Sequence, residues 1–338
     1  MQIFVTGVAG FIGHALAQRL LAEGHTVCGI DNLNSYYSVT LKKDRLETIK
    51  DHPNFLFHQI DLCDHEQLFE LLQTNQFDYV VHLAAQAGVR YSLENPFAYS
   101  DSNLTGFLNI LEGCRHYPPK HLIFASSSSV YGANRKVPFS VTDFVDHPVS
   151  LYAATKKANE LMAHAYSHLY QIPITGLRFF TVYGPWGRPD MAYFKFVDAI
   201  NNNRPIEVYN HGQMRRDFTY IDDVVEGIVR LMPYLPKKMT DSPDHVSQAL
   251  YKIYNLGNHQ PMELLHFIQV IEKALGKSAD LVMKPMQSGE VVETYADVGD
   301  LETDIDFSPS TPLETGIGKF VGWYRTYSSG KTATCSSG

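Results

Sequence analysis

The first half of the chain alternates short apolar runs with amphipathic stretches. Apolar runs at residues 3–5, 26–30, 55–60, 79–83 and 121–125 have the length of buried β-strands. Regular alternation with short connections predicts a parallel sheet covered by helices on both faces, with right-handed crossovers. We therefore expect an α/β fold with a Rossmann-type, doubly wound parallel sheet, whose ligand site lies at the carboxyl ends of the strands.

The amphipathic stretches supply the expected helices. After a first helix around Ala15 to Leu21, the apolar spacing predicts helices at 65–73, 96–116 and 150–170. From about residue 175 the pattern becomes less regular, although 263–275 still has helical spacing.

This change of pattern divides the chain into three expected parts. Residues 1–174 should form most of the Rossmann domain. Residues 175–327 should form a smaller C-terminal substrate-binding domain that is interleaved with the sheet. Residues 328–338 contain few apolar side chains, which favours a flexible tail.

Composition and charge narrow the class of protein. The 338 residues are 44% hydrophobic and 19% charged, as in ordinary globular proteins, and no apolar run approaches the ~20 residues that span a membrane. Met1 leads directly into a short strand and not into a signal peptide, so we expect a cytoplasmic protein. A formal net charge of -8 disfavours binding to nucleic acid or to a membrane surface, although it permits local basic pockets for an anionic substrate.

Cysteine and histidine spacing predicts neither disulfides nor a metal site. The four cysteines form no CxxC pair, and we interpret Cys28, Cys63 and Cys114 as small apolar fillers in a reducing compartment. His164 and His168 have the spacing of a metal pair, but no glutamate lies between them and no third ligand is evident. A solvated helix face explains them better.

A glycine-rich turn comes directly after the first strand. Gly7, Gly10 and Gly13 in TGVAGFIG stand between a strand and a helix, where backbone amides at a helix N-terminus can bind a dinucleotide pyrophosphate. Gly7 suits the tight turn, Gly10 a close approach of phosphates, and Gly13 close packing of the helix. This pattern is weak evidence alone, so its interpretation depends on the residues at the ends of the later strands.

The ends of the next strands carry side chains that suit a nucleotide. Asp31 stands about 20 residues beyond the glycines, where a carboxylate accepts hydrogen bonds from an adenosine ribose and repels a 2′-phosphate, which favours NAD over NADP. The alternative is an aspartate that caps the following turn with Asn32. By the same rule, Asp61-Leu62 and Leu83-Ala84-Ala85 should line the adenine and ribose.

A hydroxyl cluster and a Tyr-Lys pair come after the fifth strand. Ser126 to Ser129 end that strand, and Tyr152 and Lys156 stand one helical turn apart on the helix expected at 150–170. A tyrosine of pKa ~10 needs a nearby positive charge to act as a base near neutral pH, and Lys156 can provide it. Each feature is common alone, but their order after the glycine turn indicates a catalytic base.

Taken together, these motifs resemble the extended short-chain dehydrogenase/reductase family, specifically its nucleotide-sugar epimerases. The resemblance runs from TGVAGFIG through HLAAQAGVRYSLENP, FASSSSVYG, YAATKKANE and LRFFTVYGP to RRDFTYIDDVV and YADVGDLETDIDFSP. It implies that Ser127, Tyr152 and Lys156 are catalytic. It also implies cofactor contacts at Gly7, Gly10, Phe11, Ile12, Gly13, Asp31, Asp61, Leu62, Ala84, Asn103 and Phe179.

Departures from the family pattern reduce the number of reactions that the chain is expected to catalyse. Family dehydratases carry an Asp-Glu pair after the catalytic hydroxyl, and UDP-glucuronate decarboxylases carry a glutamate before the valine of VYG. This chain has Ser128 and Ser129 there, which favours simple epimerisation. The string FFTVYGPWGRPDMA, residues 179–192, resembles the UDP-glucuronate 4-epimerases, whereas galactose epimerases usually have an asparagine in this stretch.

The same resemblance suggests substrate contacts. Arg188 is the candidate for the sugar carboxylate, because a guanidinium binds a carboxylate bidentately, although it could instead pair with Asp190. The other candidates are Thr181 and Ser128 for the carboxylate, Arg216 and Arg90 for the diphosphate, and Glu290 for a ribose hydroxyl. At this last position the chain departs from the family, which usually has an arginine before Pro-Gly-Asp, whereas this chain has Gln287-Ser288-Gly289-Glu290.

The implied activity is interconversion of UDP-glucuronate and UDP-galacturonate through a 4-keto intermediate, with NAD bound throughout. The alternatives are a UDP-glucose 4-epimerase, a UDP-glucuronate decarboxylase, or an inactive NAD-binding regulatory protein, since fold alone does not prove activity. The family also implies a homodimer formed through the helices at 96–116 and 150–170. A galacturonate product would suit surface polysaccharide synthesis.

Overall fold

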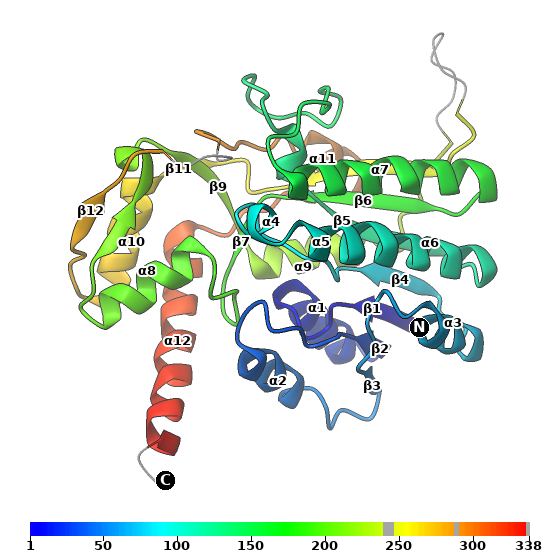
Figure 1. Ribbon diagram of the computed structural model, residues 1–338, viewed down its shortest axis with the longest axis horizontal. Coiled ribbons are helices and arrows are strands. Elements are labelled where there is room, and N and C mark those ends of the chain that lie inside the picture. Colours follow the sequence, from blue (N-terminus) through cyan, green and yellow to red (C-terminus); the bar gives the residue numbers. More distant parts are fainter. Residues whose placement is uncertain (239–246, 287–290, 336–338) are drawn as a thin grey trace.

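The computed structural model describes residues 1–238, 247–286 and 291–335, and a seven-stranded sheet forms its centre (Figure 1). Its strands are β1 (Gln2–Thr6), β2 (Thr26–Ile30), β3 (Phe55–His58), β4 (Tyr79–His82), β5 (His121–Ser127), β6 (Ile174–Phe179) and β10 (Tyr251–Leu256). They are arranged in the order β10-β6-β5-β4-β1-β2-β3, and every neighbouring pair is parallel. The order reverses between β1 and β4, which is where open α/β sheets bind ligands.

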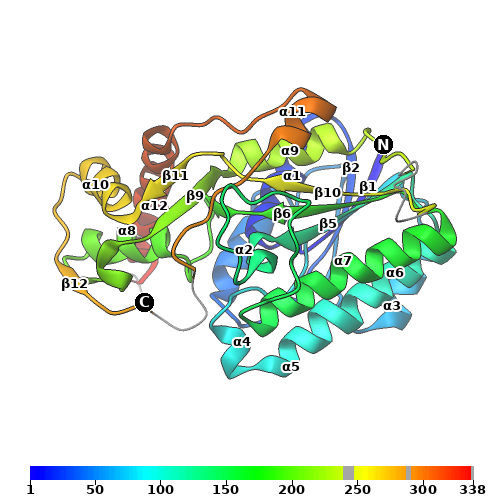
Figure 2. The ribbon, with the colours of Figure 1, turned by 90° about the horizontal axis from the view of Figure 1, so that it is seen from above.

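Helices cover both faces of this sheet (Figure 2). On one face lie α3 (His65–Thr74), α6 (Gly106–His116) and α7 (Leu151–Tyr170), and on the other α1 (Phe11–Ala22) and α9 (Ile221–Leu231). Because both faces are covered, the central strands are buried on both sides, which explains their continuous apolar runs. The predicted doubly wound α/β fold is confirmed.

The helix expected at 96–116 is divided into three segments. These are α5 (Pro96–Tyr99), a π-helical segment η1 (Ser100–Thr105), and α6. The buried side chain of Asn103 lies in the π segment, where its Nδ2 donates to the Gln86 carbonyl oxygen at 3.0 Å and to Thr155 Oγ1 at 3.0 Å. A single wide turn at this point lets the Asn103 amide reach both partners, as π segments at functional sites often do.

The remaining elements form a second, smaller body beside the carboxyl ends of the strands (Figure 1). It contains a sheet of β7 (Thr181–Tyr183), β9 (Arg215–Tyr220) and β11 (Pro261–Glu263), a pair of β8 (Ile206–Val208) and β12 (Leu281–Met283), and helices α8 (Ala192–Asn201), α10 (Leu264–Leu275) and α12 (Leu313–Cys335). Between its elements the chain returns to the main sheet, where β10 pairs with β6. Short elements complete the fold: α2 (Val39–Glu47), α4 (Tyr91–Glu94), η2 (Ser128–Tyr131), η3 (Tyr209–Gly212) and α11 (Gly299–Ile305).

Helix α12 continues into the segment that the sequence predicted as a tail. It extends to Cys335, so residues 328–335 are helical, while the last three residues lie outside the described part of the chain. The Tyr327 ring stacks on Trp323 at 5.0 Å, and its hydroxyl donates to Asp44 Oδ2 at 2.5 Å. The hydrogen bond to Asp44 fastens the helix to α2, which periodicity alone does not reveal.

The turn between β1 and α1 is as tight as the glycine pattern predicts. Gly7 has a φ of +72°, and a Cβ atom there would lie 2.8 Å from the Ala84 nitrogen. A Cβ atom on Gly13 would lie 2.2 Å from the carbonyl oxygen of Gly7. The obstacles are backbone atoms, so neither position can accept a side chain without moving the turn.

Gly13→Ala is therefore expected to destabilise the protein by about 1–3 kcal/mol, the usual cost of overpacking. Urea unfolding should show this loss as a lower midpoint. Gly322→Ala is the matched control, because a Cβ atom on that helical glycine meets nothing within 4 Å. It should leave stability unchanged or raise it by up to about 1 kcal/mol. Equal effects of the two substitutions would contradict the steric explanation.

Buried His121 makes stability depend on pH. Its Nδ1 lies 3.0 Å from the Met232 carbonyl oxygen and its Nε2 lies 2.8 Å from Thr175 Oγ1, and burial lowers its pKa from 6.5 to about 4. The unfolded chain therefore takes up this proton first as pH falls. The neutral ring contributes fully to the free energy of unfolding above pH 6.5. This contribution is lost as the pH falls toward 4, at about 1.4 kcal/mol per pH unit.

Urea unfolding between pH 7 and pH 4.5 measures this dependence. His121→Gln should reduce the slope of unfolding free energy against pH by about 1.4 kcal/mol per unit within the window. Buried His14 and His82, whose pKa values are lowered to about 3, should keep part of the slope in this variant. A slope that His121→Gln does not reduce would contradict the role assigned to His121.

Candidate active site

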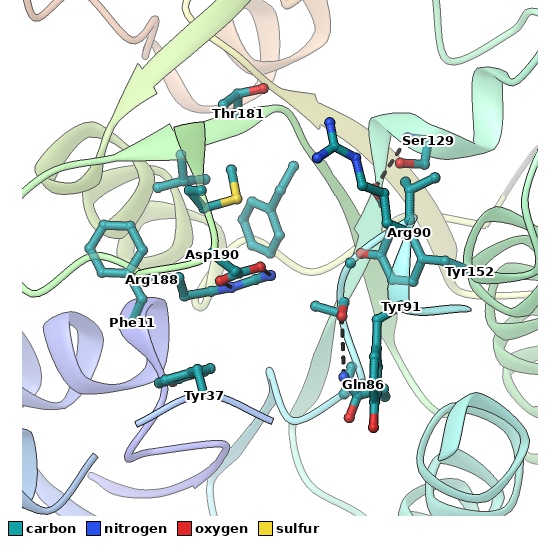
Figure 3. Close-up of a pocket in the computed structure, with 18 of the residues that line it drawn as sticks. Phe11, Tyr37, Gln86, Arg90, Tyr91, Ser129, Tyr152, Thr181, Arg188 and Asp190 are labelled. Atoms are coloured by element: carbon teal, nitrogen blue, oxygen red, sulfur yellow. Dashed lines mark hydrogen bonds and ion pairs between the residues drawn. The ribbon is translucent and has the colours of Figure 1, made fainter. Parts of the chain in front are cut away.

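A cavity of about 880 Å³ lies at the carboxyl ends of the central strands, between the main sheet and the smaller body (Figure 3). Strand register explains how distant residues meet there: Thr6 pairs with both Ile30 and His82, and Ser127 pairs with Phe179. The residues just beyond these strand ends therefore share one edge of the sheet. The cavity wall includes these predicted residues: Gly7, Gly10, Phe11, Ile12, Gly13, Asp31, Asn32, Asp61, Leu62, Leu83, Ala84, Ala85, Arg90, Ser127, Ser128, Tyr152, Lys156, Phe179, Thr181, Arg188 and Arg216.

Two predicted site residues are not among them. Asn103 is 1% exposed and stands behind the wall, where its Oδ1 accepts from the Gln86 nitrogen at 2.8 Å. It positions the Gln86 loop and α7. Glu290, with Gln287 to Gly289, lies outside the described residues. The cavity also includes Tyr36, Tyr37, Lys42 and Asp190, which sequence reasoning did not select as site residues.

The N-terminus of α1 faces the cavity without a side-chain cap. Gly10 is its N-cap, and no side chain bonds the amides of the first turn. Helix N-termini of this kind bind phosphate through backbone N–H groups and the helix dipole. With three glycines in close contact around it, this turn fits a dinucleotide pyrophosphate.

Asp31 both caps a turn and lines the cavity, so its turn contacts are compatible with the predicted ribose contact. Its carboxylate accepts from the Leu33 nitrogen at 2.8 Å and from the Ala9 nitrogen at 3.2 Å. Burial raises the pKa of Asp31, while the nearby ammonium of Lys42 acts in the opposite direction. A carboxylate accepts about four hydrogen bonds, so two acceptor positions remain for a ribose.

The Ser-Tyr-Lys set stands where β5 meets α7. Ser150 caps α7 by accepting from the Ala153 nitrogen at 3.1 Å, and Tyr152 lies in the first turn. Lys156 Nζ donates to the Ala125 carbonyl oxygen at 2.8 Å, which ties the helix to the end of β5. Burial lowers the pKa of Lys156 to about 8.

Burial also raises the pKa of the Tyr152 phenol, while its hydrogen bond with Ser127 and the charge of Arg188 lower it. The pKa of this hydroxyl is therefore set by opposing effects, burial on one side and the Ser127 and Arg188 contacts on the other. The sequence predicted Lys156 as the cation acting on this phenol, whereas in the structure the charge that lowers the pKa of Tyr152 is that of the Arg188 guanidinium. Ser127 adds a hydroxyl within hydrogen-bond reach, as a proton-transfer site requires.

The three predicted arginines line the cavity from different segments, and Arg204 lines it as well. Arg188 pairs with Asp190, with Nε to Oδ1 at 3.0 Å and Nη2 to Oδ2 at 2.5 Å (Figure 3). Arg90 lies over the ring of Tyr209 at 5.2 Å, and Arg216 Nη1 donates to the Val292 carbonyl oxygen at 3.0 Å. The cavity therefore has positive side chains despite the negative net charge of the protein.

A buried polar network supports the catalytic strand end. Arg178 forms a two-point ion pair with Glu160, at 2.8 and 2.9 Å, and Ser126 Oγ donates to the same carboxylate at 2.7 Å. Arg178 Nη1 also bonds the Tyr131 hydroxyl at 3.0 Å. Sequence reasoning missed this network, although a charged residue such as Arg178 within a short, otherwise mostly apolar run is a signal of a buried ion pair.

Comparison with known proteins agrees with this geometry. The sequence matches the NAD dependent epimerase/dehydratase family over residues 3–257. The chain belongs to this family. In this epimerase/dehydratase chain, no described helix is long and apolar enough to cross a membrane. The described residues also contain no group of three or more His, Cys, Asp or Glu side chains arranged to hold a metal ion.

Similar proteins cover nearly the whole chain. It is 56% identical over 332 residues to Protein CapI of Staphylococcus aureus, covering 97% of this chain and 99% of that protein. It is 50% identical over 332 residues to a probable UDP-glucuronate 4-epimerase of Rhizobium meliloti, with 96% and 97% covered. A structure of UDP-glucuronic acid 4-epimerase from Bacillus cereus, in complex with UDP-glucuronic acid and NAD, is 33% identical with a TM-score of 0.86, covering 97% of this chain and 100% of that one.

Proposed function

We propose that this protein is a UDP-glucuronate 4-epimerase that interconverts UDP-glucuronate and UDP-galacturonate with a resident NAD. The observation that carries this proposal is the shared cavity, in which Ser127, Tyr152 and Lys156 lie with both the glycine turn and Arg188. Relatives and a structural neighbour named for this activity support it.

The described residues fit NAD. The uncapped N-terminus of α1 suits the pyrophosphate, Asp31 suits the adenosine ribose, and small Ala84 and Ala85 leave room beside the sheet. Bound NAD supplies a hydride acceptor at the sugar C4 position and later returns the hydride, so net redox is zero. A cofactor regenerated in each cycle should copurify with the protein.

Residues of the chain remove the proton of the C4 hydroxyl and later return it. Tyr152, as phenolate, accepts the proton of the C4 hydroxyl, and Ser127 orients that hydroxyl or relays the proton. Lys156 and Arg188 favour the phenolate by their charge. After the sugar has turned within the cavity, the Tyr152 phenol returns the proton to the oxygen on C4, which completes epimerisation.

The site must also prevent the sugar carboxylate from being lost as carbon dioxide. Oxidation at C4 makes the substrate a β-keto acid, which loses carbon dioxide when its carboxylate stands perpendicular to the ring carbonyl. We assign Arg188, Thr181 and Ser128 to hold the carboxylate away from that orientation, and Arg216 and Arg90 to the diphosphate. These groups line one cavity and supply hydroxyl and guanidinium donors for anions. The smaller body then acts mainly as the UDP-sugar domain.

A homodimer through α6 and α7 is part of the proposal. Apolar side chains stand exposed on and beside these helices: Leu93, Phe97, Leu108, Leu161 and Leu169, with Phe97 77% exposed. Exposed apolar patches of this kind usually mark a protein interface. Sedimentation should give twice the mass of the chain, and Phe97→Ser with Leu161→Ser should shift it toward the monomer.

Product analysis tests the function directly. The purified protein, with its bound NAD, is incubated separately with UDP-glucuronate and UDP-glucose, and the products are identified by proton NMR. UDP-galacturonate supports the proposal. UDP-xylose would instead indicate a decarboxylase, UDP-galactose from UDP-glucose a glucose epimerase, and no turnover with NAD still bound a regulatory protein.

A further inference from the structure

The pairing of Arg188 with Asp190 bears on how the sugar is held and released. Asp190 occupies the Nε–Nη2 edge of the guanidinium, which is one of the two edges at which an arginine binds a carboxylate bidentately. Both side chains line the cavity and are about a quarter exposed, at 22% and 25%. Asp190 and the substrate therefore present the same chemical group to one arginine.

The backbone that carries this pair is firmly held. Arg45, which is fully buried, donates to the Trp186 carbonyl oxygen at 2.6 Å and to the Gly187 carbonyl oxygen at 3.2 Å. A Cβ atom on Gly187 would lie 1.8 Å from the Tyr193 hydroxyl, so the chain is closely packed there. Arg188 can therefore change partners by rotating its side chain, without movement of the loop.

The Asp190 carboxylate also has a second partner. The Tyr36 hydroxyl donates to its Oδ2 at 3.2 Å, so the charge keeps a hydrogen bond when Arg188 turns away. Figure 3 shows Arg188 and Asp190 together on the cavity wall, with Phe11 and Tyr37 nearby. Rotation of Arg188 thus does not leave Asp190 without a donor.

We propose that Asp190 is a positioning residue that competes with the sugar carboxylate for Arg188, so that the sugar can release Arg188 and turn between its two orientations. This inference rests on the proposed function. The carboxylate is attached next to C4, so turning the ring moves it across the cavity. An arginine that held it without competition would stabilise one orientation of the bound sugar and raise the barrier to turning.

Asp190→Asn tests the competition. Binding is measured by calorimetry on the NAD-bound protein in a Tyr152→Phe background, where the sugars remain unreacted. The competition predicts about tenfold tighter binding of UDP-glucuronate and UDP-galacturonate, equal to about 1.4 kcal/mol, and unchanged binding of UDP-glucose. With Tyr152 present, KM and kcat for UDP-glucuronate should both fall about tenfold. Asp190→Ala should act in the same direction, and Asp190→Glu should restore wild-type values.

Glu226→Gln is the matched control. Glu226 has the same side-chain exposure of 25% and pairs with Arg19 at 2.8 Å, away from the cavity wall, so its loss should change neither affinity nor kcat. Weaker or unchanged binding of the acidic sugars in both Asp190→Asn and Asp190→Ala, or an equal change for UDP-glucose, would overturn the competition. If the wild type produced no UDP-galacturonate, the proposed function would be refuted. The calorimetric measurements would still show whether Asp190 competes with the sugar carboxylate for Arg188.

Discussion

Tyr152→Phe is expected to lower kcat for UDP-glucuronate by about 10²–10⁴-fold, the usual contribution of a positioned general base. The substitution removes one oxygen atom, which is the atom that exchanges a proton with the C4 hydroxyl. The ring itself stays packed, with Tyr99 at 6.1 Å in an edge contact. Folding and cofactor binding should therefore be preserved while turnover is lost.

Product formation by NMR and the NAD content of the purified protein measure the two effects separately. Tyr166→Phe is the control on the same helix, because its hydroxyl donates to Glu112 Oε1 at 2.6 Å and the residue is not part of the cavity wall. It should cost about 1 kcal/mol of stability and leave kcat unchanged. A Tyr152→Phe protein that retains turnover, or that loses NAD together with activity, would contradict the assigned role.

The sequence predicted the fold well because the decisive signals are local. The first five strands are predominantly apolar, and short apolar runs of this kind can be recognised in a sequence without knowing which strands pair. The β2 strand begins and ends where it was predicted, at Thr26 and Ile30. Family membership is likewise confirmed. It could be predicted because the motifs that carry it are short and keep fixed spacings.

The site was harder to predict where it depends on contacts between distant segments. Asn103 was expected at the cofactor, yet its amide is used 17 residues away at Gln86 and 52 residues away at Thr155. The pairing of Arg188 with Asp190 was an open alternative, because two residues of spacing permit it without requiring it. The hydrogen bond that fastens α12 to α2 joins Tyr327 to Asp44, which lies 283 residues earlier in the chain. No local pattern encodes such a contact.

The second large effect is expected from Glu160→Ala, which should lower the free energy of unfolding by about 3–5 kcal/mol. The Arg178 side chain is 4% exposed and would keep its charge in an apolar interior without a carboxylate. Ser126 Oγ would lose its acceptor in the same step. A lower urea midpoint measures the loss. The control is Lys120→Met, which breaks an exposed pair with Asp78 and should cost no more than about 1 kcal/mol.

A double variant separates the unpaired charge from simple loss of packing. Glu160→Leu together with Arg178→Met replaces the ion pair by apolar groups, and such replacements of buried pairs are often nearly neutral. We expect the double variant to recover most of the stability that Glu160→Ala loses, whereas equal losses would indicate that packing and not charge is responsible. The recovered protein should still turn over more slowly than the wild type, because Ser126 adjoins Ser127 and its hydroxyl would no longer be held by a carboxylate. The same pair of substitutions would then restore the free energy of unfolding but not the turnover rate. This is expected if the network positions the end of β5 at the catalytic site more than it stabilises the fold.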